Sequence, residues 1–137
     1  MKHFAVTFEI STKDYSLQEL SRLLGSDADS FSHNIDNIRG NDASTNTIWK
    51  LESRIPEEAD ITEHLNDIRS IVIEKRVLDI GKIPAQCSIS LNIGVFYYTT
   101  YTAYCSIAIP PDHWKWMYEN NISLEINCYP CSDNPDD

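Results

Sequence analysis

The residues with the most obvious chemical potential are two cysteines near the carboxyl terminus. Cys128 and Cys131 are separated by Tyr129 and Pro130, the Cys-x-x-Cys spacing found in thiol redox sites and in zinc sites. A redox pair of the thioredoxin type opens a helix after a strand, whereas only an acidic tail follows this pair. Zinc needs two more ligands, and the chain has no second close pair of Cys or His. We therefore expect no metal and no cofactor, and we leave open whether this pair has a redox role.

Aspartates gather in the segment from Ser26 to Thr45, which is also rich in Ser and Asn. The segment lacks the glycine and the final glutamate of a calcium-binding loop, so we interpret it as a solvated acidic loop. A loop of this length in a small domain is often functional, which makes it a candidate for contact with a partner. The candidate residues are Asp27, Asp29, Asp36 and Asp42.

Aromatic side chains form a second group of candidates for partner binding. Four tyrosines lie between residues 97 and 104, and Trp116 falls off the apolar stripe Trp114, Met117 and Tyr118 of a later helix. Exposed Tyr and Trp are the usual anchors of protein interfaces. The alternative is that these rings complete the core or cover a sheet edge. The tyrosines are Tyr97, Tyr98, Tyr101 and Tyr104.

Catalysis has no support in the motifs. The chain contains no Gly-rich phosphate loop, no Gly-x-Ser-x-Gly elbow and no His-Glu-x-x-His pair. His64 has no partner in a ligand motif, so a surface histidine or one with satisfied hydrogen bonds is the simpler interpretation. We therefore expect a protein that is not an enzyme.

The net charge of −10, from 11 basic and 21 acidic residues, excludes classes of partner. Nucleic acids and anionic membranes both select clustered Lys and Arg. A basic protein partner suits the charge, because complementary charge accelerates encounter, although acidity can also serve solubility alone. The first ten residues alternate as a strand and do not form a signal peptide, so we expect a cytoplasmic protein.

The longest regular pattern runs from Pro84 to Pro110. Apolar residues alternate with polar ones on both sides of an aromatic and threonine-rich stretch, Phe96 to Tyr104, which predicts a long antiparallel hairpin. The predicted inward residues are Cys87, Ile89, Leu91, Ile93 and Val95, followed by Ala103, Cys105, Ile107 and Ile109.

The other elements follow from alternation and capping signals. We predict strands over 3–10, 47–53 and 122–128, and helices over 17–24, about 61–80 and from Pro110 to Asn120. Ser16 with Glu19 and Asp60 with Glu63 are capping boxes. The order is strand, helix, strand, helix, strand, strand, helix, strand. It predicts a single α+β domain, 1–137, with an antiparallel or mixed sheet of about five strands and helices mainly on one face.

Several of these motifs together resemble a family of small bacterial domains of unknown function. They are the strand Phe4-Ala-Val-Thr-Phe-Glu-Ile, the helix end Leu20-Ser-Arg-Leu-Leu-Gly25, Trp49-Lys-Leu-Glu-Ser53, Glu63-His-Leu65 and the strand led by Cys87. The chain departs from the family after Gly25, where the acidic segment stands in place of Pro-Thr and a basic, aromatic stretch.

By its type, as a small acidic α+β protein without catalytic motifs, the chain also resembles immunity proteins of contact-dependent bacterial toxin systems. That resemblance implies a protein that binds a cognate toxin, such as a basic nuclease, and occludes its active site. The alternative is a small-molecule-binding or regulatory domain with a pocket between sheet and helices, lined by Trp49, Tyr97 and Trp114.

Overall fold

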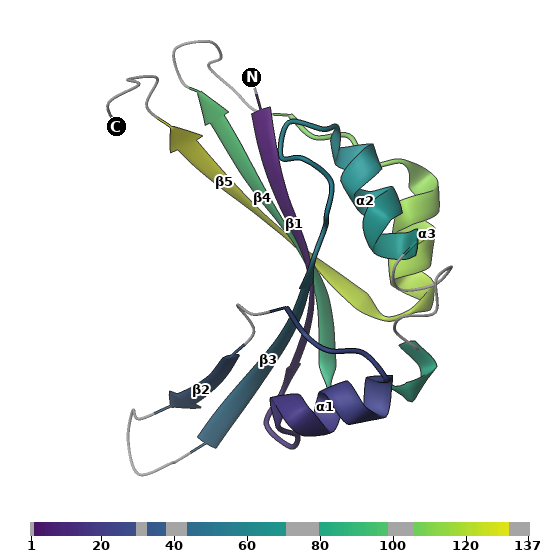
Figure 1. Ribbon diagram of the computed structural model, residues 1–137. Coiled ribbons are helices and arrows are strands. Elements are labelled where there is room, and N and C mark those ends of the chain that lie inside the picture. The colour runs from purple at the N-terminus through teal and green to yellow at the C-terminus, as the bar shows by residue number, and fades with distance from the viewer. Residues whose placement is uncertain (1, 30–32, 38–43, 71–79, 99–105, 132–137) are drawn as a thin grey trace.

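The computed structural model describes residues 2–29, 33–37, 44–70, 80–98 and 106–131. They form a five-stranded sheet with the strand order β2-β3-β1-β4-β5, and helices lie against one of its faces (Figure 1). All neighbouring strands are antiparallel except β4 and β5, which are parallel. The predicted α+β class, with a mixed sheet of about five strands, is confirmed. The elements are β1 (Lys2–Thr12), α1 (Leu17–Leu24), β2 (His33–Asn37), β3 (Ser44–Glu52), α2 (Ile61–Arg69), the 3-10 turn η2 (Ile80–Lys82), β4 (Ser88–Tyr98), α3 (Pro111–Glu119) and β5 (Ile122–Cys131).

Strand β1 lies in the middle of the sheet and pairs with β3 on one side and β4 on the other. Its alternate residues Phe4, Val6, Phe8 and Ile10 are all buried. They meet equally buried residues from the neighbouring strands, because paired residues of adjacent strands point to the same face of a sheet. These neighbours are Trp49 and Leu51 of β3 and Leu91, Ile93 and Val95 of β4. The helix-covered face of the sheet is therefore the hydrophobic core.

The hairpin predicted over 84–110 is wrong. Strand β4 pairs with β1 and β5, and residues 106–110, the described part of the expected second arm, have no strand structure. Ile107 and Ile109 instead pack against the core as an irregular segment, and the predicted inward residues Ala103 and Cys105 lie outside the described residues. Alternation of apolar and polar residues indicates which side chains of a segment are buried, but it does not show with which other strand that segment pairs.

The prediction of a continuous loop from Ser26 to Thr45 is also wrong. His33–Asn37 forms strand β2, which pairs antiparallel with β3, and β3 begins at Ser44 rather than Thr47. In this short edge strand Ile35 is the one apolar residue among polar ones, so there is no alternation of apolar residues from which the strand could be predicted.

The capping boxes predict the helix starts correctly. The Ser16 side chain accepts a hydrogen bond from the Glu19 backbone N–H, and the Glu19 carboxylate accepts one from the Ser16 backbone N–H. Asp60 and Glu63 form the same pair of bonds at the start of α2. Gly25 ends α1 with a φ of 68°, in the left-handed region that glycine tolerates. The described α2 ends at Arg69. The rest of its predicted length falls on residues 71–79, which lie outside the described residues, and on the separate turn η2.

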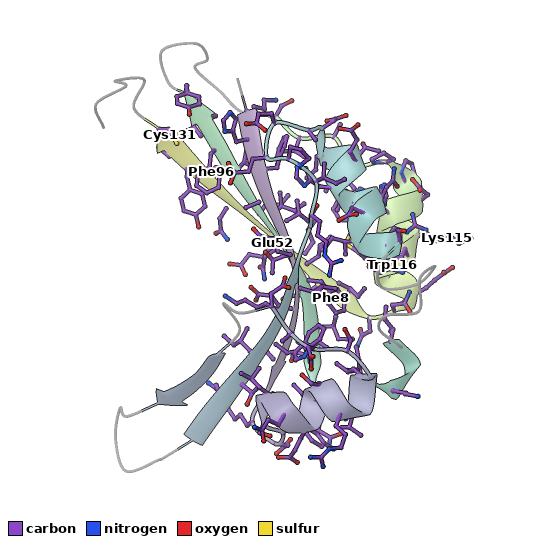
Figure 2. The ribbon with its side chains drawn as sticks, viewed as in Figure 1. Phe8, Glu52, Phe96, Lys115, Trp116 and Cys131 are labelled. Carbon is purple, nitrogen blue, oxygen red and sulfur yellow. The ribbon has the colours of Figure 1, made fainter. Side chains whose placement is uncertain are left out.

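Helix α3 presents a different face to the core from the predicted one. Trp114 and Tyr118, predicted in its core stripe, are 48% and 88% exposed, whereas Trp116, predicted to be exposed, is only 6% exposed. His113 and Met117 are buried beside Trp116. Figure 2 shows Trp116 in the region between α2 and α3. A spacing of three to four residues fits both the Trp114 stripe and the His113–Trp116–Met117 stripe. The second stripe is hard to recognise in the sequence because one of its buried residues is a histidine, which is usually counted as polar.

Arg69 of α2 joins the two helices. Its Nη1 donates to Asp112 Oδ2 at 2.9 Å and to His113 Nδ1 at 3.3 Å, and its guanidinium lies 5.7 Å from the centre of a Trp116 ring. Because an arginine can only donate, His113 must accept at Nδ1, which requires the neutral imidazole. Burial lowers the pKa of His113, and the Arg69 charge also lowers it, while Asp112 opposes both effects.

The corrected face of α3 predicts a contrast between two tryptophans. Trp116→Ala should lower the free energy of unfolding by about 3 kcal/mol, because it removes a buried ring. Trp114→Ala, on the exposed face of the same helix, should cost less than about 1 kcal/mol. Urea denaturation of both variants measures the difference, and equal losses would contradict the assigned face.

The lowered pKa of His113 predicts loss of stability in mild acid. The unfolded chain binds a proton at about pH 6.5, where the folded protein still excludes it, so stability is complete above that pH and falls as the pH decreases toward the folded-state pKa. The thermal midpoint should therefore fall between about pH 7.5 and pH 5.5. In His113→Gln, which keeps an acceptor for Arg69, that fall should be smaller, whereas His3→Gln should retain it. An unchanged pH dependence in His113→Gln would refute the assignment.

Candidate binding face

The face of the sheet opposite the helices is the candidate functional surface. In Figure 1 the described helices α1, α2 and α3 all lie on one side of the sheet, and none of them covers the other side. Figure 2 shows Phe96 on that uncovered side, with Phe8 and Trp116 on the helix side. The alternation that buries one set of residues along β1 and β4 presents the intervening set on this second face. We call it the open face and define it by the rows described next.

Strand pairing arranges the open face in rows that run across the sheet. The first row is aromatic: His3 of β1 pairs with Phe96 of β4, which pairs with Tyr129 of β5. The rings of Phe96 and Tyr129 are stacked, with centroids 5.0 Å apart and an interplanar angle of 17°. The His3 ring meets Tyr98 edge-on at 5.8 Å. One end of the open face is therefore an aromatic patch.

The next rows are small and then polar. Ala5 pairs with Gly94, and the row continues to Asn127, so two of its three positions have almost no side chain. The row beyond begins at Glu52, passes through Thr7 and Asn92, and ends at Glu125. A row of small residues between taller neighbours leaves a hollow, and a cavity of about 460 Å³ lies over these rows. We call this cavity the open-face groove; Phe96 and Tyr129 line one end of it, and Glu9, Asn92 and Glu125 line the rest together with the small residues.

The open face is acidic. By register, the charged residues on the described strands β3, β1, β4 and β5 at this face are Glu9, Glu52, Glu125 and Lys50. The Lys50 ammonium lies 3.8 Å from the Glu9 carboxylate, which balances that one acid. The Asn92 Oδ1 is buried and has no hydrogen-bond partner among the described residues. The surface therefore offers negative charge, and it has an unpartnered amide oxygen buried beneath it.

Few of the predicted partner-binding residues reach this face. Tyr98 does, whereas alternation places Tyr97 on the helix side, and Tyr101, Tyr104 and Asp42 lie outside the described residues. Asp36 pairs with Thr45 in the β2–β3 ladder.

The other three candidates lie away from the open face or have a structural role. The carboxylate of Asp29 accepts a hydrogen bond from the Glu52 backbone at 2.6 Å, and its own N–H donates to the Lys50 carbonyl, so Asp29 caps the edge of β3. Trp116 is buried, so the prediction that it is an exposed anchor is wrong. Asp27 is exposed beside α1.

The prediction missed the residues that build the groove, although the sequence contained their signal. Thr7, Glu9, Asn92 and Gly94 are the polar or small positions of strands whose apolar positions were recognised. The sequence places Phe96 in the aromatic stretch between the two arms of the predicted hairpin, and it distinguishes Tyr129 only as a residue of the Cys-x-x-Cys motif. Recognising the group needs the strand register, which a single sequence does not supply.

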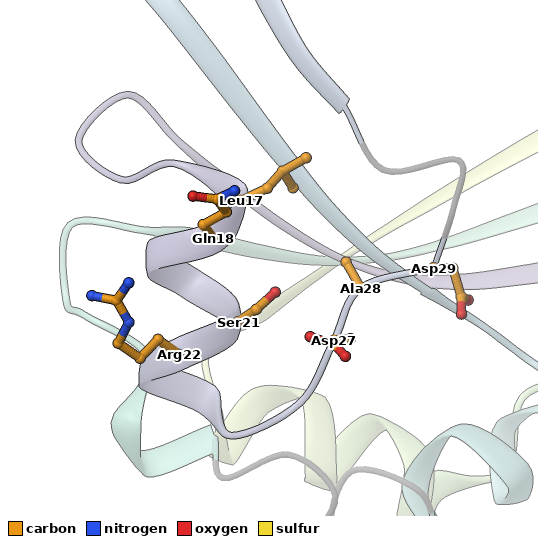
Figure 3. Close-up of a pocket in the computed structure, with 7 residues that line it drawn as sticks. All are labelled: Leu17, Gln18, Ser21, Arg22, Asp27, Ala28 and Asp29. Atoms are coloured by element: carbon orange, nitrogen blue, oxygen red, sulfur yellow. The ribbon is translucent and has the colours of Figure 1, made fainter.

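A second cavity, of about 640 Å³, lies between α1 and residues 27–29 (Figure 3). Two of its polar residues already serve the fold: Ser21 Oγ accepts a hydrogen bond from Trp49 Nε1, and Asp29 caps β3. In Figure 3 the Arg22 side chain points away from residues 27–29. The predicted pocket lined by Trp49, Tyr97 and Trp114 has no counterpart here, because Trp49 is completely buried and Trp114 is half exposed on α3.

The cysteine pair sits on strand β5, which limits its chemistry. Residues three apart on a strand are about 10 Å apart and point to opposite faces, too far for a disulfide.

Burial raises the pKa of the Cys87 thiol, which disfavours the reactive thiolate. The described residues include no group of three or more His, Cys, Asp or Glu that could hold a metal ion.

His64 is buried on α2. Its Nδ1 lies 2.9 Å from Ser53 Oγ, and its ring meets Phe4 edge-on. Its Nε2 has no hydrogen-bond partner among the described residues, so the prediction of a satisfied histidine holds at one nitrogen only.

Across the described parts of the chain, no helix is long and apolar enough to span a membrane.

Comparison with known proteins gives a family and nothing further. No curated protein and no solved structure matches the chain. The family described as "Domain of unknown function (DUF4279)" matches residues 1–130, which is nearly the whole chain. The strand, helix and cap motifs that resemble a bacterial domain family of unknown function fall within that match. The chain therefore belongs to the DUF4279 family of domains of unknown function.

Proposed function

We propose that this chain is a binding protein for a basic protein partner, and that the partner is a toxin domain which it neutralises by occlusion. The observation that carries the proposal is the open face, an acidic sheet surface that no described helix covers, with an aromatic patch and a groove. In this proposal the chain acts in the cytoplasm of the producing cell and catalyses no reaction.

The composition of the open face suits a protein interface. Interfaces combine an aromatic, well-packed centre with a polar rim, and Tyr and Trp are enriched among their energetic anchors. Here Tyr129 is 47% exposed beside Phe96, and Glu52 and Glu125 lie at the two ends of one row. A partner that lies across the rows would cover the rings and meet the carboxylates at the margins.

Charge favours a basic partner. The chain has a net charge of −10, and the described strands carry three carboxylates and one lysine on the open face. Such a surface attracts a cationic protein and repels a second copy of this chain or a nucleic acid. The active site of a nuclease must itself attract phosphates, so an acidic surface can occupy it as a mimic of substrate charge.

The second candidate function is binding of a small molecule in the cavity beside α1. That cavity is large enough for a ligand, at about 640 Å³, but the hydrogen bonds of Ser21 and Asp29 already serve the fold. A metabolite that raises the thermal midpoint without any protein partner would favour this function.

The experiment for the proposed function is co-purification with the product of the adjacent gene, followed by calorimetric titration. We expect a stoichiometric complex whose affinity falls as salt rises, because exposed charges are screened. The double variant Glu52→Gln/Glu125→Gln should weaken the complex about tenfold, equivalent to about 1.4 kcal/mol.

The matched control is Glu58→Gln, which removes an exposed carboxylate beside a cavity on the helix side. It should bind as the wild type does. If no complex forms even at low salt, the proposal fails. If Glu58→Gln and the double variant weaken a complex equally, the partner does not bind through the open face.

A further inference from the structure

We propose that the open-face groove is a receptor for an arginine side chain of the partner. This inference rests on the proposed function, since it names the group that the open face recognises. The groove provides a hollow floor, an aromatic wall and an exposed carboxylate, which together match a guanidinium group.

The floor of the groove depends on Gly94. A Cβ at this position would lie 3.4 Å from Phe96 Cε2 and 3.6 Å from Ala5 Cβ, so the site would tolerate a side chain, which would then occupy the hollow. Among the described glycines only Gly25 has a positive φ, so the backbone at position 94 does not require glycine. The missing side chain therefore has its effect on the shape of the groove rather than on the backbone.

The wall at one end of the groove is the Phe96–Tyr129 pair. The two rings lie nearly parallel, and Tyr129 is half exposed. A guanidinium is planar and only weakly hydrated, so it packs against an aromatic ring with a favourable cation–π term. An ammonium group is more strongly hydrated and gains less from such a wall.

The acceptor lies one row away from the hollow. The Glu125 carboxylate is exposed and, among the described residues, has a long contact of 3.4 Å with Asn127 Nδ2. A guanidinium offers five N–H donors in one plane and can bind a carboxylate through two parallel N–H groups. The described residues that line the groove include no Lys or Arg to compete for this carboxylate.

The test uses short extended peptides and nuclear magnetic resonance. The probe is acetyl-Gly-Ala-Arg-Ala-Gly-amide, and the control peptide carries citrulline in place of arginine, which keeps the shape and removes the charge. Titration of labelled wild-type protein to about 10 mM peptide should shift the amide signals of Asn92, Gly94 and Asn127, with a Kd on the order of 1 mM. The citrulline peptide should produce less than a tenth of these shifts.

Two variants separate the shape of the groove from its charge. Gly94→Val fills the hollow and should abolish the shifts, and Gly94→Ala, the milder change, should reduce them if Gly94→Val does not fold. Glu125→Gln keeps the shape and should weaken binding several-fold, while Glu58→Gln should have no effect.

Other outcomes would overturn the inference. Absence of shifts with the arginine peptide, equal shifts with citrulline, or full binding by folded Gly94→Val or Gly94→Ala would each do so. The inference and the proposed function fail separately: a partner complex that forms without peptide binding refutes only the groove, and peptide binding without a partner complex refutes only the toxin-binding function.

Discussion

The one-sided burial of strand β1 is the constraint on which the rest of the structure depends. It is the central strand, and Phe4, Val6, Phe8 and Ile10 along one side are all buried. Fully burying side chains of this size contributes about 1.5–3 kcal/mol each. A slip of the strand register by one residue would turn these apolar side chains to the opposite face and put polar ones in the core, so this burial energy fixes the register. The helices must therefore collect on that face, and the opposite face is left without a cover from any described helix.

This arrangement separates the face that stabilises the fold from the face that we propose for recognition. The covered face contains the core, the two capping boxes and the contacts of Arg69 with α3. The open face contains the residues that alternate with the core along the same strands, so the register that orders the core also orders the aromatic, small and polar rows. A recognition surface built on strands in this way is held more rigidly than one built on loops.

Features encoded locally could be predicted from the sequence, whereas features that depend on strand pairing could not. Ser16 with Glu19 fixes the start of α1 through hydrogen bonds between neighbours in sequence, and the alternation of β1 reports its own burial. The pairing of β4 with β5, which follows only after α3, depends on the competition among all strands. Most of the candidate site could not be predicted from the sequence, because its rows form only when β1, β4 and β5 are paired in register.

Aromatic residues show the same limit on a smaller scale. Trp114 and Trp116 are two residues apart on one helix, and the sequence assigned them to the wrong faces, because both possible stripes have helical spacing. In the sequence Tyr129 is distinguished only by the two cysteines around it, yet its ring stacks on that of Phe96, 33 positions earlier. Composition identifies residues capable of recognition, and the fold selects which of them reach a surface together.

The measurement that tests the central claim most directly is hydroxyl-radical footprinting of this protein alone and in complex with the proposed basic partner. Tyr129 and Trp114 are suitable reporters, because their exposed fractions are nearly equal, 47% and 48%, and they lie on opposite sides of the sheet. If the open face is the binding surface, oxidation of Tyr129 falls several-fold in the complex while oxidation of Trp114 and Tyr118 is unchanged. Protection of Trp114 or Tyr118 with no change at Tyr129 would contradict the account and place the interface on the helices.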